Sequence, residues 1–509
     1  MCGIAGIMNL PANTTPPKEH ELTQMLAAIR YRGPDESGIY LSNNVGLGNV
    51  RLSILDLTTG QQPISANDGR YWIVYNGEVF NYIELRKTLQ AEGITFYTNT
   101  DTEVVLQAFI RWGSGCLQKF NGQFAIAIWD NQEQELFLAR DRVGIRPLFY
   151  TQSQGQFIFC SEIKGIFQIP HVRREINHRA LSQIFTFWTT LTPLTPFEQV
   201  FEVSPGHYMK IKNGKVESNA YWSLQFPLPG QYNRVGIDES VEELRGLFRE
   251  AVKIRLRADV EVAAYLSGGI DSSVTTAFIH ELEPGVLNTF SIGFKDRNFD
   301  ETSFQLEAAK YFNTRHTAFT CSSEDIGQAF YDTIRHTEFP VLRTSPTPMY
   351  LLSKKVREQN IKVVITGEGA DEMLAGYNIF KEDKIRRFWA RSPQSDIRPL
   401  LLKKLYPYLP MMKDARTPIL KMFFGYRLSD VDHACYSHLL RWHNTSRIQN
   451  YFSADVQLSL NNYEPLDEVS RLLGENFSQW GDLAKAQYLE STIFMSGYLL
   501  VAGRPHGYG

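Results

Sequence analysis

The sequence predicts an α+β domain followed by an α/β domain that is built on a parallel sheet. Up to about residue 212 the chain reads as short apolar strands and turns, for example at residues 72–80 and 124–130. A stretch rich in Gly, Pro, Ser and Asn then interrupts this pattern. After it come a helix, an apolar strand, a glycine turn, a second helix and a second strand, an alternation typical of a parallel α/β sheet.

The same patterns divide the chain into domains and elements. We expect a first domain at residues 1–212, a linker at 213–238 and a second domain at 239–509. The expected elements are helices at 21–30, 102–112 and 240–256 and strands at 261–266 and 287–294. From about residue 377 to 498 the pattern is mostly helical, with proline breaks.

The composition excludes several classes of protein. At 509 residues the chain is too long for one small module, and 52 Lys and Arg against 55 Asp and Glu leave a net charge of −3. Without a basic excess we expect neither nucleic acid nor a membrane surface as a partner. No run approaches the roughly 20 apolar residues of a membrane helix, and we recognise no signal peptide. Five widely spaced cysteines without a CxxC pair favour the reducing cytoplasm.

Cys2 is the first candidate for chemistry. It follows the initiator Met, which we expect to be removed because Cys is small. Its thiol, with an ordinary pKa of about 8.5, and its α-amino group, with a pKa of about 7.7–8.0, then share one residue, so the amine can accept the thiol proton. Taken alone, a cysteine in this place is more often an ordinary buried residue at the start of a strand.

Five sequence blocks favour the catalytic interpretation of Cys2. They are RGPDESG at 32–38, RLSILDL at 51–57, YNGEVFNY at 75–82, NTDTEV at 99–104 and LARDRVGIRPLFY at 138–150. Together they resemble the class II glutamine amidotransferase domain, an N-terminal-nucleophile sandwich fold. The resemblance implies that Cys2 attacks the glutamine carboxamide and that Asn76 and Gly77 stabilise the oxyanion, as an Asn side chain and a Gly N–H can do.

The same resemblance assigns the glutamine-binding residues. Glutamine carries an α-carboxylate and an α-ammonium, which call for a guanidinium and a carboxylate. Arg51 matches the family position for the first, and Asp101, with Glu78 close by, matches the second. Singly, Arg51 reads as a surface charge and Asp101 as a helix N-cap. Asn49 departs from the family, which usually has His there, so we expect a supporting contact to differ.

A second centre lies at residues 264–274, AYLSGGIDSSV. A strand that ends in Ser-Gly-Gly, with Asp-Ser-Ser opening a helix, directs N–H groups and hydroxyls toward a phosphate. A Gly-Gly turn is otherwise ordinary, and the Walker sequence is absent. The motif SGGxDS resembles the PP-loop of the ATP pyrophosphatases, an α/β fold. The resemblance implies that ATP is bound by Leu266, Ser267, Gly268, Gly269, Asp271, Ser272 and Ser273, together with Ile292, Gly367 and Glu368.

A further strand-to-helix turn, VVITGEGADEMLAGY at 363–377, carries additional carboxylates. Asp271 and Asp371 stand at the ends of neighbouring parallel strands, so we expect them to share Mg2+ with phosphate oxygens. Glu368 resembles the family's catalytic acid. The alternative is that Glu368, Asp371 and Glu372 are an acidic first helical turn favoured by the helix dipole.

Both halves, in this order, resemble the glutamine-hydrolysing asparagine synthetase family over residues 1 to about 500. The resemblance implies that aspartate, ATP and glutamine give asparagine, AMP, pyrophosphate and glutamate through β-aspartyl-AMP, with ammonia passing inside the protein. The implied partners are therefore glutamine, aspartate and ATP, and a homodimer is left open. The alternatives are a glutaminase alone, an amidotransferase for another carboxylate, and a non-enzymatic ATP-binding protein.

The end of the chain departs from the family pattern. It reads SGYLLVAGRPHGYG, where the family continues with a YLLSSQGDRMAMA-like segment and a later Lys that stabilises adenylation. Codons for residues 501–508 can be chosen so that the neighbouring frame encodes Ser-Gln-Gly-Asp-Arg-Met-Ala-Met. We therefore expect a truncated, frame-shifted C-terminus with weaker synthetase activity, and a naturally divergent tail is the alternative.

Overall fold

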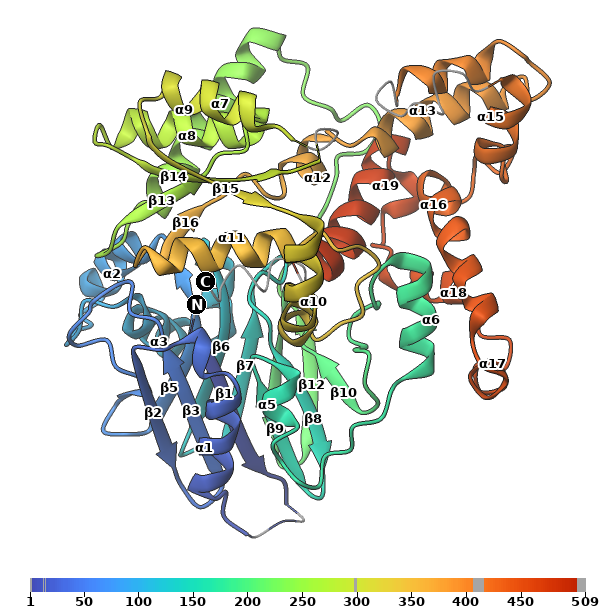
Figure 1. Cartoon of the computed structure of the whole chain (residues 1–509). Coiled ribbons are helices and arrows are strands. Elements are labelled where there is room, and N and C mark those ends of the chain that lie inside the picture. Colours follow the sequence, from blue (N-terminus) through green and yellow to red (C-terminus); the bar gives the residue numbers. More distant parts are fainter. Residues whose placement is uncertain (1, 12, 14, 297–299, 406–415, 501–509) are drawn as a thin grey trace.

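The computed structural model describes residues 2–11, 13, 15–296, 300–405 and 416–500. The N-terminal half is a sandwich of two antiparallel sheets, and the C-terminal half holds a parallel sheet followed by a helical region (Figure 1). The predicted α+β sandwich followed by an α/β domain is confirmed. The expectation about the tail at 501–509 lies outside the described residues.

The first sheet has six strands in the order β10-β8-β9-β1-β3-β2. Strand β1 lies in the middle of the sheet and is buried along its whole length. It begins directly after Cys2, and its register places Gly3 opposite Val50, near the end of β3. The strands are β1 (Gly3–Asn9), β2 (Glu36–Leu41), β3 (Val45–Arg51), β8 (Phe149–Ser153), β9 (Gln156–Cys160) and β10 (Val200–Glu202).

The second sheet also has six strands, in the order β12-β11-β7-β6-β5-β4. Its strand β5 carries the predicted oxyanion residues Asn76 and Gly77 and then Glu78. The strands are β4 (Ile64–Ala66), β5 (Tyr71–Val79), β6 (Gly122–Asp130), β7 (Glu135–Arg140), β11 (His207–Lys212) and β12 (Lys215–Ala220).

Helices cover the outer faces of this sandwich. Apolar side chains of both sheets, such as Ile4, Val74 and Phe159, fill the space between the sheets. Helices α1 (Glu19–Ala28) and α5 (Ile163–Ile166) pack on the first sheet, and α2 (Tyr82–Ala91), α3 (Asp101–Trp112) and α4 (Cys116–Lys119) pack on the second. Helix α6 (His178–Phe187) packs instead against the C-terminal helical region. The N-terminal half is therefore an α-β-β-α arrangement.

The C-terminal half begins with helix α7 and a four-stranded parallel sheet in the order β15-β14-β13-β16. Helices α7 and α8 pack on one face of this sheet, and α11 packs on the other. The strands are β13 (Val262–Tyr265), β14 (Asn288–Phe294), β15 (Arg315–Cys321) and β16 (Val363–Ile365). The helices around them are α7 (Ile237–Arg255), α8 (Ile270–Leu282), α9 (Thr302–Tyr311), α10 (Ser323–Thr337), α11 (Pro346–Glu358) and α12 (Ala370–Leu374).

The rest of the described chain is helical, as predicted. Its α-helices are α13 (Asn378–Ala390), α15 (Thr417–Phe424), α16 (Tyr436–Ser446), α17 (Ala454–Leu460), α18 (Pro465–Val469) and α19 (Asp482–Leu489). Helix α19 continues into the π-helical segment η7 (Glu490–Leu499). Short 3-10 helices are η1 (Arg30–Arg32), η2 (Gly113–Gly115), η3 (Arg398–Lys404), η4 (Arg447–Tyr451), η5 (Ser470–Leu472) and η6 (Phe477–Gln479).

The predicted elements are found within a few residues of their expected bounds, with one larger difference in the linker. Strand β12 lies inside the expected linker at 213–238 and pairs with β11. The turn between them is Asn213-Gly214, whose φ angles of 53° and 80° are those of a two-residue hairpin turn. The Asn-Gly pair is thus a hairpin signal rather than a linker signal, and the exact domain boundary stays a prediction.

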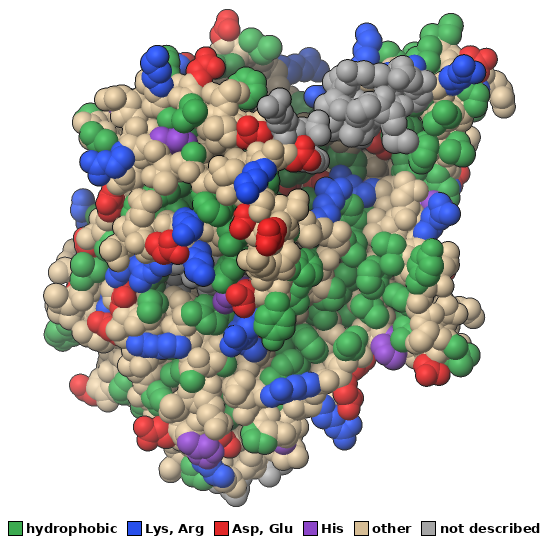
Figure 2. All heavy atoms as spheres, in the orientation of Figure 1, with side chains coloured by type: hydrophobic (Ala, Val, Ile, Leu, Met, Phe, Trp, Pro, Cys, Tyr) green, Lys and Arg blue, Asp and Glu red, His purple; other side chains and the backbone are tan. Residues whose placement is uncertain are grey.

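The surface carries both signs of charge. On the face drawn in Figure 2, Lys and Arg side chains are interspersed with Asp and Glu, in agreement with the net charge of −3. Within the described ranges, no helix is long and apolar enough to cross a membrane.

Two glycines allow a test of the hairpin. Gly214→Ala should lower stability by about 1 kcal/mol, because its φ of 80° disfavours a residue with a Cβ. Gly246→Ala is the matched control, since Gly246 lies in α7 with nothing within 4 Å of an added Cβ. The control should raise stability by up to about 1 kcal/mol. Thermal melting of both variants measures this, and a stabilised Gly214→Ala variant would contradict the assigned turn.

Candidate functional site

The predicted residues of the first centre meet in one pocket. Six of them line it together, although they lie far apart in the sequence: Cys2, Arg51, Asn76, Gly77, Glu78 and Asp101. They come from the start of β1, the end of β3, the second half of β5 and the start of α3. The pairing of β1 with β3, and the packing of both against β5, bring these segments together. Further lining residues include Leu52, Ile54, Leu55, Gln62, Tyr75 and Arg146.

The sulfur of Cys2 is held against the residue that follows β3. The N–H of Leu52 donates to the Cys2 Sγ at 3.4 Å, and the Sγ lies 3.7 Å from the Leu52 carbonyl oxygen. The Cys2 carbonyl accepts a hydrogen bond of 2.9 Å from Nε of Arg32. Arg32 is fully buried and forms an ion pair with Glu162 at 2.6 Å. The half-buried thiol of Cys2 is therefore fixed from two sides while it lines the pocket.

Asn76 brings an unpaired donor to the same pocket. Its side chain is buried, and its Nδ2 has no hydrogen-bond partner among the described residues. Leaving such a group unpaired costs about 1–3 kcal/mol, so an acceptor that enters the pocket is favoured there. At Gly77 an added Cβ would lie 2.4 Å from the carbonyl oxygen of Gln123. Only glycine lets the backbone approach this closely.

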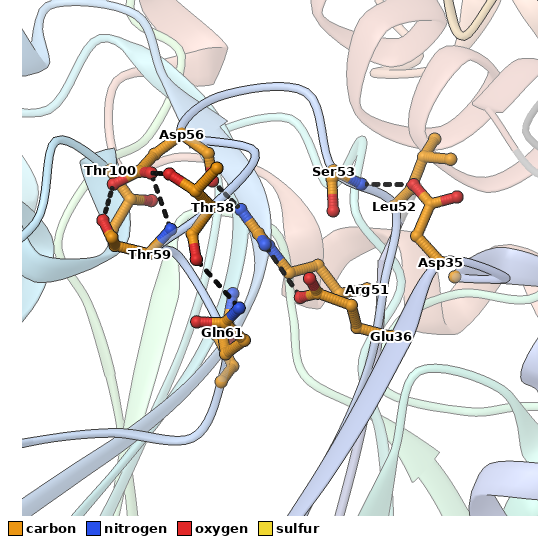
Figure 3. A network of polar contacts seen from close by, with 12 residues as sticks. Asp35, Glu36, Arg51, Leu52, Ser53, Asp56, Thr58, Thr59, Gln61 and Thr100 are labelled. Atoms are coloured by element: carbon orange, nitrogen blue, oxygen red, sulfur yellow. Dashed lines mark hydrogen bonds and ion pairs between the residues drawn. The ribbon is translucent and has the colours of Figure 1, made fainter.

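Arg51 is the centre of a folded loop, which Figure 3 shows from close by. Its Nη1 pairs with Glu36 at 2.8 Å, and its Nη2 donates to the carbonyl oxygens of Leu55 and Asp56 at 2.9 and 2.7 Å. A Cβ at Gly60 would lie 2.3 Å from this Nη2. Residues 52–56 therefore wrap around the guanidinium, and the position of Arg51 depends on the shape of this loop.

Asp101 is buried, and Glu78 is half-buried near it in the same pocket. Thr100, not Asp101, caps α3, since its side chain accepts from the Thr102 N–H. The Asp101 carboxylate instead accepts from the Tyr75 hydroxyl at 2.9 Å. Burial raises the pKa of Asp101. Burial and then the charge of Asp101 raise the pKa of Glu78 to about 8. A cation between the two groups would relieve this repulsion.

Two contacts of the pocket were not predicted. Arg146 lines the pocket, and burial lowers its pKa. It was not predicted as a pocket residue, although it belongs to the matched block at 138–150. Asn49, the departure from the family, makes a supporting contact of its own. Its Nδ2 donates to the carbonyl oxygens of Gly3 at 3.2 Å and Tyr75 at 3.3 Å, and the residue is fully buried. Asn49 therefore ties the strand next to Cys2 to the strand that carries Asn76.

The predicted phosphate loop joins β13 to α8. The Ser272 hydroxyl bonds with the Ser267 hydroxyl at 2.9 Å and accepts from the Ser267 N–H at 3.2 Å. Gly268 has a φ of 80°, and a Cβ there would lie 2.7 Å from the backbone of Phe304. Ser267 and Gly269 are exposed at the N-terminus of α8, so the loop opens to solvent. Leu266 and Ser273 lie in the same segment, and Ile292 lies on the adjacent strand β14.

The turn after β16 packs against the phosphate loop. A Cβ at Gly367 would lie 2.9 Å from the Cβ of Asp271, so the two segments touch. Burial and then the charge of Asp271 raise the pKa of Asp371. Glu368 is exposed in this turn, before α12 begins. Glu372 is buried and accepts from the Tyr377 hydroxyl at 2.8 Å, so its role is structural.

Comparisons with known proteins identify the family of both halves of the chain. A family model described as a glutamine amidotransferase domain matches residues 1–222, and one described as asparagine synthase matches residues 243–505. Asparagine synthetase (glutamine-hydrolyzing) 1 of Bacillus subtilis (strain 168) is 32% identical over 508 residues, covering 98% of this chain and 76% of the relative. The chain belongs to the glutamine-hydrolysing asparagine synthetase family.

Two other known proteins match a smaller part of the chain. Asparagine synthetase (glutamine-hydrolyzing) 3 of the same organism is 31% identical over 419 residues, covering 79% of this chain and 67% of the relative. The solved structure of glutamine phosphoribosylpyrophosphate amidotransferase from B. subtilis, complexed with ADP and GMP, covers 71% of each chain at 17% identity. Its TM-score is only 0.33, so the two structures do not superpose as a whole.

The family assignment made from the motifs is confirmed, and the protein is a glutamine-dependent ligase that uses ATP. We call residues 1–222 the glutaminase lobe and residues 243–505 the synthetase lobe, after the two matched models.

Asn49→Ala should lower kcat for glutamine hydrolysis by about tenfold with a smaller effect on KM, because it loosens the alignment of Cys2 with Asn76. Glutamate release at saturating glutamine measures this. The control is Asn219→Ala, an exposed position on β12. Equal kcat values for Asn49→Ala and the unmodified chain, with equal melting temperatures, would show that the bridge does not align the site.

Glutamine binding should depend on pH through Glu78. Its pKa of about 8 means that it is protonated near neutral pH, whereas an ammonium ligand favours the ionised form. Affinity should therefore rise with pH, by at most about tenfold per pH unit, and level off above about 8. Calorimetry on the Cys2→Ala variant separates binding from catalysis. Adding Glu78→Gln should weaken binding and flatten the profile, and an unchanged slope would remove Glu78 from the ammonium site.

Proposed function

We propose that this chain forms asparagine from aspartate, ATP and glutamine, with its two lobes acting on separate substrates. The observation that carries the proposal is the unpaired Nδ2 of Asn76 in the pocket that Cys2 lines. A buried donor that lacks a partner beside a thiol is the arrangement that an oxyanion requires. A glutaminase alone would leave the carboxylates of the second site without a role, and the relatives named asparagine synthetase favour aspartate over another carboxylate.

In the glutaminase lobe, Cys2 is the proposed nucleophile, and its own α-amino group accepts the thiol proton. The thiolate attacks the glutamine carboxamide, and the Asn76 amide and the Gly77 N–H stabilise the oxyanion. Arg51 binds the α-carboxylate of glutamine. Asp101 and Glu78 bind its α-ammonium, which is supported by their raised pKa values and by their place in the pocket. Ammonia leaves, and water releases glutamate from the thioester.

In the synthetase lobe, the loop at 266–273, together with Ile292 and Gly367, is the proposed ATP site. Phosphate oxygens bind at the N-terminus of α8, where N–H groups and the helix dipole favour an anion. Asp271 and Asp371 fit a Mg2+ ion, because the charge of Asp271 helps to raise the pKa of Asp371 and a cation bound by both carboxylates would relieve that repulsion. Mg2+ would neutralise phosphate charge there. Glu368 is the proposed acid–base residue for the attack of ammonia on β-aspartyl-AMP.

Ammonia should pass between the sites inside the protein, because water at neutral pH would protonate it. Segment η7 supports such a route. The Ser496 hydroxyl donates to the carbonyl oxygen of Val143 at 3.0 Å, three residues before the pocket residue Arg146. The Met495 sulfur lies 3.5 Å from where a Cβ of Gly369 would be, next to Glu368. One segment thus contacts a residue near each site. The proposed division of 1–212, linker 213–238 and 239–509 changes only in that β12 moves the end of the first domain to about residue 220.

Two substitutions should separate the two reactions. Cys2→Ala should abolish glutamine hydrolysis and leave ammonia-dependent asparagine formation intact. Asp271→Asn should abolish ATP-dependent pyrophosphate release and leave glutamine hydrolysis intact, because it removes one Mg2+ ligand. Glutamate, pyrophosphate and asparagine are measured for each variant. Parallel loss of both reactions in either variant would refute the division of labour, and retained pyrophosphate release in Asp271→Asn would refute the metal assignment.

A further inference from the structure

Loop 52–56 forms one wall of the glutamine pocket and has no regular structure. Strand β3 ends at Arg51, and the next residues are neither helix nor strand. Leu52, Ile54 and Leu55 nevertheless line the pocket. Because no sheet or helix ladder holds these residues, their conformation depends on side-chain and tertiary contacts.

Several of those contacts come from the synthetase lobe. Lys362 Nζ lies 2.6 Å from the Asp35 carboxylate and 3.3 Å from the Ser53 carbonyl oxygen, and both partners belong to the glutaminase lobe. The Asp35 carboxylate also accepts from the Ser53 N–H at 2.8 Å, as Figure 3 shows. Lys362 thus holds the loop directly and through Asp35. Burial raises the pKa of Asp35, but the hydrogen bonds from Lys362 and Ser53 outweigh burial and bring this pKa below its usual value.

Asp259 holds the other end of the same loop. Its carboxylate accepts from the Asp56 N–H at 2.7 Å, and its own N–H donates to the Ile54 carbonyl oxygen at 3.0 Å. Two residues earlier, Arg257 donates to the carbonyl oxygen of Phe80, just after the pocket residue Glu78, at 2.7 Å. The segment before β13 therefore contacts both the Arg51 side and the Glu78 side of the pocket.

The topology of the parallel sheet explains why these two residues act together. Asp259 lies three residues before β13, and Lys362 immediately precedes β16. The two strands are neighbours, with Val262 opposite Val363, so Asp259 and Lys362 share the amino edge of the sheet. The carboxyl ends of the same strands lead into the loops at 266–273 and 367–372. One sheet thus carries the proposed ATP site at one edge and holds the glutamine loop at the other.

We propose that Asp259 and Lys362 are positioning residues for glutamine hydrolysis, which hold loop 52–56, and with it Arg51, in the shape that binds glutamine. The inference rests on the proposed function of the Cys2 pocket. Neither residue lines the pocket, so both act through the loop. A purely structural role in joining the lobes would affect stability and all activities alike. A positioning role affects the KM for glutamine, because Arg51 depends on the loop carbonyls that surround it.

The test uses the full chain and two pairs of substitutions. Lys362→Met and Asp259→Ala should each raise the KM for glutamine by about five- to tenfold, the effect expected for loss of a charge-assisted hydrogen bond. The kcat for glutamine hydrolysis, the affinity for ATP and the melting temperature should change little. Lys362→Arg and Asp259→Asn should recover most of the KM, because arginine can still donate to Asp35 and asparagine can still accept from the Asp56 N–H.

A double substitution and a control sharpen the result. Asp35→Asn should raise KM less than Lys362→Met, because it leaves the contact of Lys362 with the Ser53 carbonyl oxygen in place, and the double variant should resemble Lys362→Met. Lys355→Met is the control, since Lys355 pairs with Glu358 on the exposed side of α11. Its KM should equal that of the unmodified chain.

The outcomes are distinct. If the unmodified chain releases no glutamate from glutamine, the proposed function is wrong and the inference falls with it. If it hydrolyses glutamine but Lys362→Met and Asp259→Ala keep its KM, only the inference is overturned. In a third outcome, the KM for glutamine, the affinity for ATP and the melting temperature all worsen together, and they recover together in the conservative variants. Both residues would then serve only to dock the lobes, and the inference would also be overturned.

Discussion

The antiparallel pairing of β1 with β3 is the constraint on which the first site depends. The register that sets Gly3 opposite Val50 places Cys2 next to the residues that follow Val50, Arg51 and Leu52. A shift of one residue would turn every side chain of a strand to the opposite face of the sheet. Asn49, on the same strand, extends this constraint across the sandwich, because its amide joins the backbone of β1 to that of β5. The proposed nucleophile Cys2, the proposed carboxylate-binding Arg51 and the proposed oxyanion donor Asn76 are thereby held in place by one set of strand pairings and the Asn49 amide.

Both sites also hold two carboxyl groups close together. Glu78 lies beside Asp101, and Asp371 lies beside Asp271, and in each pair burial and the neighbouring charge raise a pKa. Keeping like charges together costs stability in the empty protein. A cationic ligand removes that cost when it binds, so the selectivity of each site for its ligand's charge is built into the folded protein.

Local patterns and motifs predicted much of this arrangement. Apolar periodicity is a local property, so helices such as α3 and strands such as β14 were expected within one or two residues of their observed bounds. The six predicted pocket residues were found together because each stands in a motif of several residues. Asp259 and Lys362 belong to no motif, and a single charge before a strand looks like a surface residue. Their contacts exist only once two lobes meet, which no local pattern encodes. Strand β12 was missed for a different reason, since Asn213-Gly214 was taken as part of a linker.

The shortness of β13 and β16 has a mechanical meaning. These strands contain four and three residues, and at about 3.3 Å per residue they span only about 10–13 Å. A hydrogen-bonded strand of that length resists stretching and bending, so it moves as a rod. Beyond their carboxyl ends the two strands lead into segments that touch, because a Cβ at Gly367, in the turn after β16, would collide with Asp271, at the start of α8. A small axial shift of either strand would therefore displace the segments at both of its ends, the loop at 266–273 or the turn at 367–372 at one edge of the sheet and the contacts with loop 52–56 at the other.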